Sequence, residues 1–321
     1  MFLRVFLTLV VVAIILLLFG PRHPVQNFPA HAEFDDPEAV VAAQEAAFDD
    51  IRPGLNAAIY RQSEGKTPLA FVYLHGFSAS PAELAPVPQD LAARFGANLY
   101  IPRLTGHGRT GDALGEAKAS DWIKDAAEAI DIGSALGEQV VVIGTSTGGT
   151  LAALAALDPE TRDEIAGVIF ISPNFRLMAK GEFILTLPFA SQIVPLILGE
   201  TRSFEPHNPA HEAGWTSSYP SRAIVPMAAL VKKARNSDYN AAAQPALFLF
   251  DPADSVVSAE ETRAVASEWG GPAQIAEVAL GPDDDPSHHV LAGDALSPSQ
   301  NAAVTDLMTN WLVETGLAPA P

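Results

Sequence analysis

A serine between small residues is the part of this chain best suited to covalent chemistry. Gly144-Thr145-Ser146-Thr147-Gly148 follows four apolar residues, 140–143, and precedes an Ala/Leu-rich run, 151–157. The first run predicts a strand buried on both faces, and the second predicts a helix. A serine on so sharp a turn stands above the sheet, within reach of a base. We therefore expect Ser146 to be a nucleophile and the N–H of Thr147, at the helix N-terminus, to stabilise an oxyanion.

The acid that such a nucleophile requires follows a later predicted strand. A serine hydroxyl is a weak nucleophile near neutral pH, so it needs a base, and the base needs an acidic partner. Asp251 and Asp254 both follow the apolar run 246–250. We prefer Asp254 because it lies on a loop a few residues beyond the strand, whereas Asp251 stands at the strand end, next to Pro252. Asp251 stays open as the alternative acid.

Two adjacent histidines follow the last predicted strand, residues 273–280. Neighbouring side chains in an extended loop point in opposite directions, so one of the two can face the site. We prefer His289 as the base because apolar residues follow it directly, and His288 stays open as the alternative. Serine, acid and histidine then occur in the order that this chemistry takes on a parallel sheet, at the edge where such sheets carry their sites.

A second oxyanion donor is expected where the apolar run 69–74 ends in His75-Gly76-Phe77. The loop after this strand supplies a backbone N–H in serine hydrolases built on parallel sheets, and here we assign it to Phe77. His107 lies in a Gly-rich loop ahead of the nucleophile, so we expect it to fix that loop and not to act as the base. Trp122 lies on the apolar side of a predicted helix and is expected to pack in the core.

Strands and helices alternate along most of the chain and then stop doing so between residues 174 and 244. Prolines interrupt that apolar segment repeatedly, and about seventy residues is too long for a structureless loop, so we expect an inserted cap of short helices over the nucleophile. Besides the segments already named, we predict strands at 55–61, 97–101 and 166–171 and helices at 81–95, 121–136, 259–269 and 298–314.

Composition excludes several classes of function. The formal net charge of -19 repels nucleic acid, whose binding requires clustered Lys and Arg. The chain has no cysteine, which excludes disulfides, thiolate nucleophiles and cysteine-ligated metals. Asp283-Asp284-Asp285 with His288 and His289 could be interpreted as metal ligands, but adjacent aspartates beside prolines are more typical of a solvated loop. We therefore predict no metal and no cofactor.

The N-terminal segment has the composition of an export signal. Residues 5–19 are apolar except for Thr8, with Arg4 before them and Gly20-Pro21-Arg22 after them. We expect an uncleaved membrane anchor with the following domain outside the cytoplasm. The alternative is a signal cleaved after Ala32, which would give a secreted or periplasmic protein.

These motifs together resemble the α/β-hydrolase superfamily, in the branch of carboxylesterases and monoacylglycerol lipases that also includes serine aminopeptidase-like and lysophospholipase-like proteins. The matching pieces lie within residues 70–315 and include Leu104-Thr105-Gly106-His107-Gly108, Asp254-Ser255-Val256-Val257 and His289-Val290-Leu291. The resemblance implies a mostly parallel sheet flanked by helices, a triad of Ser146, Asp254 and His289, and an oxyanion hole of Phe77 and Thr147. Asp251 departs from the pattern because relatives often carry glycine there.

The expected domains are an N-terminal segment, 1–32, a hydrolase core, 33–173 and 245–321, and a cap, 174–244. The expected function is hydrolysis of a small carboxylic ester with an apolar acyl group, through an acyl-enzyme. An aminopeptidase would need a cluster of carboxylates to hold an ammonium group, and the glutamates of the predicted cap are not clustered. A non-catalytic, anchored binding module is a third hypothesis, which the intact set of triad residues opposes.

Overall fold

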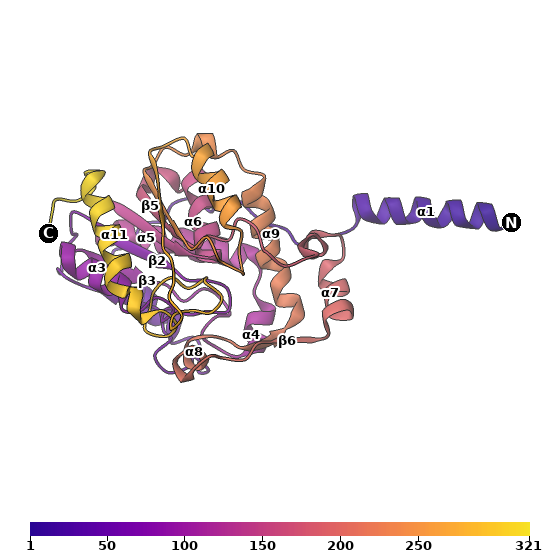
Figure 1. Cartoon of the computed structure of the whole chain (residues 1–321), viewed down its shortest axis with the longest axis horizontal. Coiled ribbons are helices and arrows are strands. Elements are labelled where there is room, and N and C mark those ends of the chain that lie inside the picture. Colours follow the sequence, from indigo (N-terminus) through magenta and orange to yellow (C-terminus); the bar gives the residue numbers. More distant parts are fainter.

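A seven-stranded sheet in the order β1-β3-β2-β4-β5-β8-β9 forms the centre of the molecule (Figure 1). This computed structural model describes the backbone of residues 1–321 and all side chains except those of Leu9, Val12, Ala13, Ile14 and Leu17. β1 is antiparallel to β3, and the other neighbours are parallel. The strands are β1 (Ala58–Tyr60), β2 (Ala70–Leu74), β3 (Asn98–Ile101), β4 (Val140–Thr145), β5 (Ile165–Ile171), β8 (Ala246–Phe250) and β9 (Ala273–Glu277).

Helices cover both faces of the sheet, which confirms the predicted fold class. β4 shows why a continuous apolar run was needed: Val142 packs in one hydrophobic cluster and Ile143 in the other, on the opposite face. One cluster contains α5 (Ala119–Leu136), α6 (Thr147–Leu157), α9 (Ile224–Arg235) and α10 (Ala259–Glu268). The other contains α3 (Val87–Phe95) and α11 (Asn301–Glu314), which lie together in Figure 1.

The segment between β5 and β8 is built from short elements. β6 and β7 form a separate two-stranded sheet, and α9 packs on α6 within the main core. The division of the chain into a core and a cap at 174–244 stays a prediction. The elements of this segment, besides α9, are η2 (Glu182–Thr186), α7 (Ala190–Leu198), β6 (Thr201–Ser203), α8 (Pro209–Gly214), β7 (Ser218–Pro220), η3 (Ser221–Ala223) and η4 (Tyr239–Ala241).

One predicted helix is shorter than expected. The sequence favours a helix over 81–95, but residues 81–86 form turns and α3 begins at Val87. Pro86 explains the difference, because proline disfavours the helical conformation in the residue before it and is itself tolerated in a first helical turn. The remaining helices are α2 (Pro37–Glu45), α4 (Gly111–Glu116) and two short 3-10 turns, η1 (Arg162–Glu164) and η5 (Pro298–Gln300).

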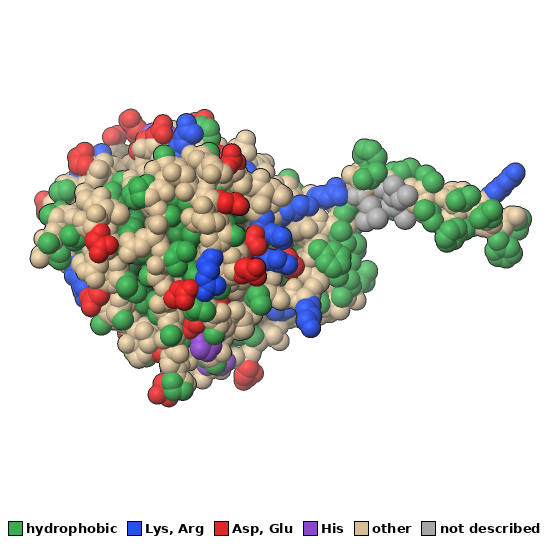
Figure 2. All heavy atoms as spheres, turned by 45° about the horizontal axis from the view of Figure 1, so that its top comes forward, with side chains coloured by type: hydrophobic (Ala, Val, Ile, Leu, Met, Phe, Trp, Pro, Cys, Tyr) green, Lys and Arg blue, Asp and Glu red, His purple; other side chains and the backbone are tan. Residues whose placement is uncertain are grey.

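α1 (Phe2–Phe19) extends away from the rest of the molecule (Figure 1), and hydrophobic side chains lie along the face shown in Figure 2. Within the part of the chain described in full, no helix is long and apolar enough to cross a membrane. This finding contradicts the predicted location. We had expected a protein anchored in a membrane with the hydrolase domain outside the cytoplasm, or one secreted after cleavage.

The chain after α1 lies against the core. Phe28 is buried there, and the Asp131 carboxylate accepts hydrogen bonds from the Ala32 N–H, at 3.0 Å, and from His31 Nδ1, at 2.6 Å. The predicted boundary at residue 32 thus falls within a packed segment, and it stays a prediction.

Candidate active site

Ser146 occupies the sharp turn between β4 and α6, as the sequence predicts. Its φ of 51° and ψ of -114° lie in a region that non-glycine residues rarely adopt. Two backbone hydrogen bonds hold this conformation, from the Ser146 N–H to the Ile171 carbonyl (3.0 Å) and from the Asn174 N–H to the Ser146 carbonyl (2.9 Å). The next strand in the sheet order, β5, and the chain just after it thus fix the backbone of Ser146.

Two glycines permit the strand and the helix to approach each other at this turn. A Cβ atom on Gly148 would lie 2.0 Å from the Leu74 carbonyl oxygen, and one on Gly144 would lie 2.6 Å from the Gly148 carbonyl oxygen. Both distances are shorter than a van der Waals contact, so a side chain at either position would force the backbone apart. The small residues two before and two after Ser146 are therefore required by close packing.

His289 and Asp254 form a buried pair. His289 Nδ1 donates to Asp254 Oδ2 at 2.8 Å, and their side chains are 11% and 1% exposed. Asp254 Oδ1 accepts the N–H groups of Val256 and Val257, at 2.8 and 2.9 Å, so the carboxylate is fixed by its own loop. Burial lowers the pKa of His289, but the Asp254 charge and hydrogen bond outweigh burial and leave this pKa raised.

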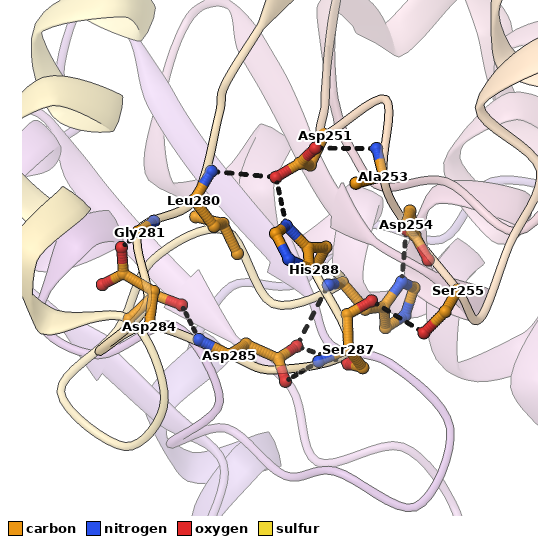
Figure 3. A network of polar contacts seen from close by, with 12 residues as sticks. Asp251, Ala253, Asp254, Ser255, Leu280, Gly281, Asp284, Asp285, Ser287 and His288 are labelled. Carbon is orange, nitrogen blue, oxygen red and sulfur yellow. Dashed lines mark hydrogen bonds and ion pairs between the residues drawn. The ribbon is translucent and has the colours of Figure 1, made fainter.

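His288 and Asp251 form a second pair beside the first. His288 Nδ1 donates to Asp251 Oδ2 at 2.7 Å, and the His288 side chain is 34% exposed. Asp251 also accepts the N–H groups of Leu280 and Ala253, both at 2.8 Å (Figure 3). Burial opposes ionisation of Asp251, but these hydrogen bonds together lower its pKa, and Asp251 in turn raises the pKa of His288. The pair joins the loop after β8 to the loop after β9.

Asp285 organises the backbone that carries both histidines. Its carboxylate accepts the N–H groups of Ser287, His289 and Val290 at 2.8–3.0 Å and the Ser287 hydroxyl at 2.7 Å (Figure 3). Asp285 is 2% exposed, and its neighbour Asp284 is also buried. The expectation of a solvated loop is therefore wrong for Asp284 and Asp285, whose oxygens accept hydrogen bonds within the loop, whereas Asp283 is exposed.

Phe77 lies in the loop after β2, as predicted. Among the hydrogen bonds of the described residues, none uses the Phe77 N–H. Thr147 is the first residue of α6, and the N–H groups of a first helical turn have no partner within the helix. Both predicted oxyanion donors thus keep a backbone N–H available to a ligand.

The Phe77 side chain connects the loop after β2, residues 75–78, which we call the oxyanion loop, to the segment between β5 and β8. Its ring packs edge-on against Tyr219 of β7, with centroids 5.4 Å apart, and against Trp122 at 6.0 Å. The next residue, Ser78, has a φ of 64°, and its carbonyl accepts the N–H of Thr216 at 2.7 Å. The β6–β7 segment therefore lies directly on the oxyanion loop.

Two buried histidines that precede Ser146 in the chain, His75 and His107, hold loops. His75 Nε2 accepts the Leu104 N–H at 3.1 Å, so His75 Nδ1 carries the proton and donates to the Gly76 carbonyl at 2.9 Å. Burial lowers the pKa of His75 well below its usual value and that of His107 to about 4. Both rings are neutral near pH 7, which agrees with the structural role expected for His107.

We did not predict one buried acid near Ser146, Glu83, from the sequence. The predicted helix 81–95 would have placed this residue in an exposed first turn. In the turn that forms instead, Glu83 is 2% exposed and accepts the Tyr73 hydroxyl at 2.6 Å. Pro81 and Pro86, which bracket a short segment with an acid among apolar residues, are the signal that could have indicated it.

Comparison with known proteins places this geometry in a family. The model of the alpha/beta hydrolase family matches residues 71–315, so the chain belongs to that family. The thermostable monoacylglycerol lipase of Bacillus sp. (strain H-257) is 28% identical over 105 residues, which are 33% of this chain and 40% of that protein. The chain thus matches less than half the length of this curated relative.

Solved structures show the same fold at low identity. A monoacylglycerol lipase from Paleococcus ferrophilus has a TM-score of 0.60 and 17% identity, covering 81% of this chain and 98% of that one. A soluble variant of monoglyceride lipase from Saccharomyces cerevisiae has a TM-score of 0.61 and 13% identity, covering 81% of this chain and 90% of that one. The chain is a lipase- and esterase-like α/β hydrolase, and the predicted branch is confirmed at this level.

Proposed function

We propose that this protein is a serine hydrolase that cleaves carboxylic esters through an acyl-enzyme on Ser146. The observation that carries the proposal is the buried 2.8 Å bond between His289 and Asp254, in a fold whose nucleophile turn presents Ser146. Asp254 holds the proton on His289 Nδ1, which leaves Nε2 as the base for the serine hydroxyl. His288 and Asp251 are not part of this triad.

The reaction then follows two balanced steps. Ser146 Oγ attacks the ester carbonyl while His289 Nε2 takes its proton, and the N–H groups of Phe77 and Thr147 stabilise the oxyanion. His289 returns the proton to the leaving alcohol, and the acyl group stays on Ser146. Water, deprotonated by His289, attacks the acyl-enzyme, and His289 gives that proton back to Ser146 Oγ as the bond to the acyl group breaks and the acid leaves. No step requires a metal or a cofactor.

An ester with an apolar acyl group is the proposed substrate, of the carboxylesterase or of the monoacylglycerol and lysophospholipid lipase type. The names of the related proteins, two of them monoacylglycerol lipases, support this class. Aminopeptidase activity is not favoured, because Glu182, one of the glutamates that could hold an ammonium group, is engaged by Arg235 at 3.1 Å and by Arg176 at 3.5 Å.

Substitution of the nucleophile tests the proposal. We expect Ser146→Ala to lower the hydrolysis of p-nitrophenyl esters by on the order of 10⁴-fold or more and to leave the circular dichroism spectrum unchanged. A fluorophosphonate should label the wild type at Ser146 alone. A series of acyl chain lengths, with an aminoacyl anilide as contrast, identifies the substrate class. Hydrolysis retained by Ser146→Ala would refute the assignment of the nucleophile.

A further inference from the structure

Glu83 is a buried carboxyl group that the proposed mechanism does not use. It lies in the turns before α3, is 2% exposed, and its Oε2 atom accepts two hydrogen bonds. One comes from the Tyr73 hydroxyl of β2, at 2.6 Å, and the other from the Gly76 N–H, at 2.8 Å. Burying a carboxyl group is costly unless its oxygens are well paired, so its presence here requires an explanation.

Glu83 and Ser146 both lie next to Gly76. A Cβ atom on Gly76 would lie 2.8 Å from Glu83 Oε1 and 3.2 Å from Ser146 Cβ, so the glycine leaves just enough room for both. The Tyr73 hydroxyl that donates to Glu83 also lies 3.2 Å from Thr145 Oγ1, next to Ser146 in the chain. Glu83 is thus connected to the residue before Phe77 and, through Tyr73, to the residue before Ser146.

The loop after β9, which carries His288 and His289 and which we call the histidine loop, packs against the turns that contain Glu83. The Asp294 N–H donates to the Ala85 carbonyl at 2.8 Å, and a Cβ atom on Gly293 would lie 2.6 Å from the Glu83 carbonyl oxygen. The ionisable groups that face the Glu83 carboxyl are Tyr73 and His289, and the charges of Glu83 and His289 favour each other. The oxyanion loop, the nucleophile turn and the histidine loop therefore meet at one buried acid.

We propose that Glu83 is a positioning residue, whose carboxylate holds the oxyanion loop against the nucleophile turn so that the Phe77 N–H points at the reacting carbonyl. The ionised form suits this role, because hydrogen bonds to a charged acceptor are shorter and stronger than neutral ones. Gly76, which donates to Glu83, is bonded directly to Phe77 in the chain. The inference rests on the proposed function, since it concerns the same reaction.

Glu83→Gln keeps the size and shape of the side chain and removes its charge. It therefore tests a positioning role separately from a packing role. Loss of an oxyanion donor lowers rates about 10²- to 10³-fold, so a misplaced donor should lower kcat/KM about 10- to 100-fold, mainly through kcat. The rate at which a fluorophosphonate labels Ser146 should fall similarly. Burial raises the pKa of Glu83 to about 7, so the wild type carries a buried charge at pH 8 that the variant lacks. The melting temperature of the variant at pH 8 should therefore equal or exceed that of the wild type.

The pH profile gives a readout that packing alone would not change. Tyr73 stays protonated, since its pKa lies well above 10, so Glu83 and His289 are the groups that must lose a proton on the acid side. The slope of log kcat/KM against pH should approach 2 in the wild type and 1 in Glu83→Gln. Asp125→Asn is the matched control, because burial also raises the pKa of Asp125 to about 7, yet Asp125 bonds the Thr105 N–H in a different loop.

The outcomes distinguish this inference from the proposed function. A slower but equally stable Glu83→Gln enzyme with a slope of 1, beside an Asp125→Asn enzyme with wild-type kinetics, supports the positioning role. A Glu83→Gln variant with wild-type kcat/KM and slope overturns it and leaves the ester hydrolase intact, as does a variant that loses activity only through a lower melting temperature. A wild type that neither hydrolyses esters nor reacts with the fluorophosphonate overturns the proposed function itself.

Discussion

The loops after β8 and β9 meet in two histidine–aspartate pairs that have nearly equal bond lengths and different surroundings. The His289–Asp254 bond is 2.8 Å long and the His288–Asp251 bond is 2.7 Å long, but the histidine side chains are 11% and 34% exposed. A short hydrogen bond alone therefore does not identify a catalytic pair. Burial distinguishes the two pairs.

The two histidines bond to different aspartates although they are adjacent in the chain. His288 has a φ of 57°, in the left-handed region, and bonds to Asp251, whereas the next residue, His289, bonds to Asp254. Asp285 stabilises the arrangement by accepting the N–H of His289 at 3.0 Å. The two pairs thus divide the work of the loop: we expect the buried pair to act in catalysis and the exposed pair to hold the loop in place.

Truncation of the two histidines gives the largest contrast. We expect His289→Ala to lower kcat/KM for a short-chain p-nitrophenyl ester by on the order of 10⁴-fold, because it removes the base. His288→Ala should retain most of the activity, within about 10-fold of the wild type, because the His288 ring is more exposed and bonds to Asp251 instead of Asp254. Both variants should be assayed well below their melting temperatures. A more damaging His288→Ala would reverse our assignment of the base.

Isosteric change of the two acids comes next in size. Asp254→Asn should lower kcat by on the order of 10³-fold, because an amide permits the wrong imidazole tautomer and supplies no charge to offset the imidazolium. Asp251→Asn should leave most of kcat, with steady-state kinetics of both variants as the measurement. Should Asp251→Asn prove the more harmful change, the acid would be misassigned although the fold would stand.

The pH dependence should follow the buried pair. His289 acts as a base in its neutral form, so activity rises with pH through its pKa, which Asp254 raises above 6.5. In Asp254→Asn burial remains without the charge, so the pKa of His289 should fall. Asp251→Asn should lower the pKa of His288 and leave that of His289 in place. NMR titration of the imidazole protons measures both, and equal shifts of the two rings in either variant would contradict the separation.

The smallest expected effect is on the free energy of unfolding. We expect it when the exposed pair, His288 and Asp251, is changed. Asp251→Asn should cost about 1–3 kcal/mol, because the N–H groups of Ala253 and Leu280 bond to different carboxylate oxygens, and one of the two would face the NH₂ group of the amide. The pKa of Asp251 is lowered, so its contribution is present above pH 3.8 and is lost as pH falls through its folded pKa. The pKa of His288 is raised, so its contribution is present below pH 6.5 and is lost as pH rises through its folded pKa.

The loss of stability in Asp251→Asn should therefore be largest between about pH 4 and 6.5, where both members of the pair are charged. Urea unfolding of the wild type and the variant at pH 5.5 and pH 9 measures it. A loss that is independent of pH would show that the backbone hydrogen bonds, and not the ion pair, carry the effect.

Much of the fold follows from local sequence. The apolar runs of β4, β5 and β8 had to be buried on both faces, and their strands lie within one or two residues of the predicted positions. The turn at Ser146 was predictable because its neighbours are glycines, and only glycines fit contacts as short as the one at Gly148. By contrast, Pro86 moved the start of α3 to Val87. The expected N-terminal anchor was wrong, because no helix among the fully described residues is long and apolar enough to cross a membrane.

The sequence by itself determined which residue types the site contains and in which order they reach the edge of the sheet, because strand burial and glycine sterics act between neighbours in the chain. Only the tertiary structure decided which aspartate pairs with which histidine, because the pairs join the loop after β8 to the loop after β9. The tertiary structure also buried Glu83. The His288–Asp251 pair joins residues 37 positions apart and the Tyr73–Thr145 contact beside Glu83 joins residues 72 positions apart, and no local pattern encodes such contacts.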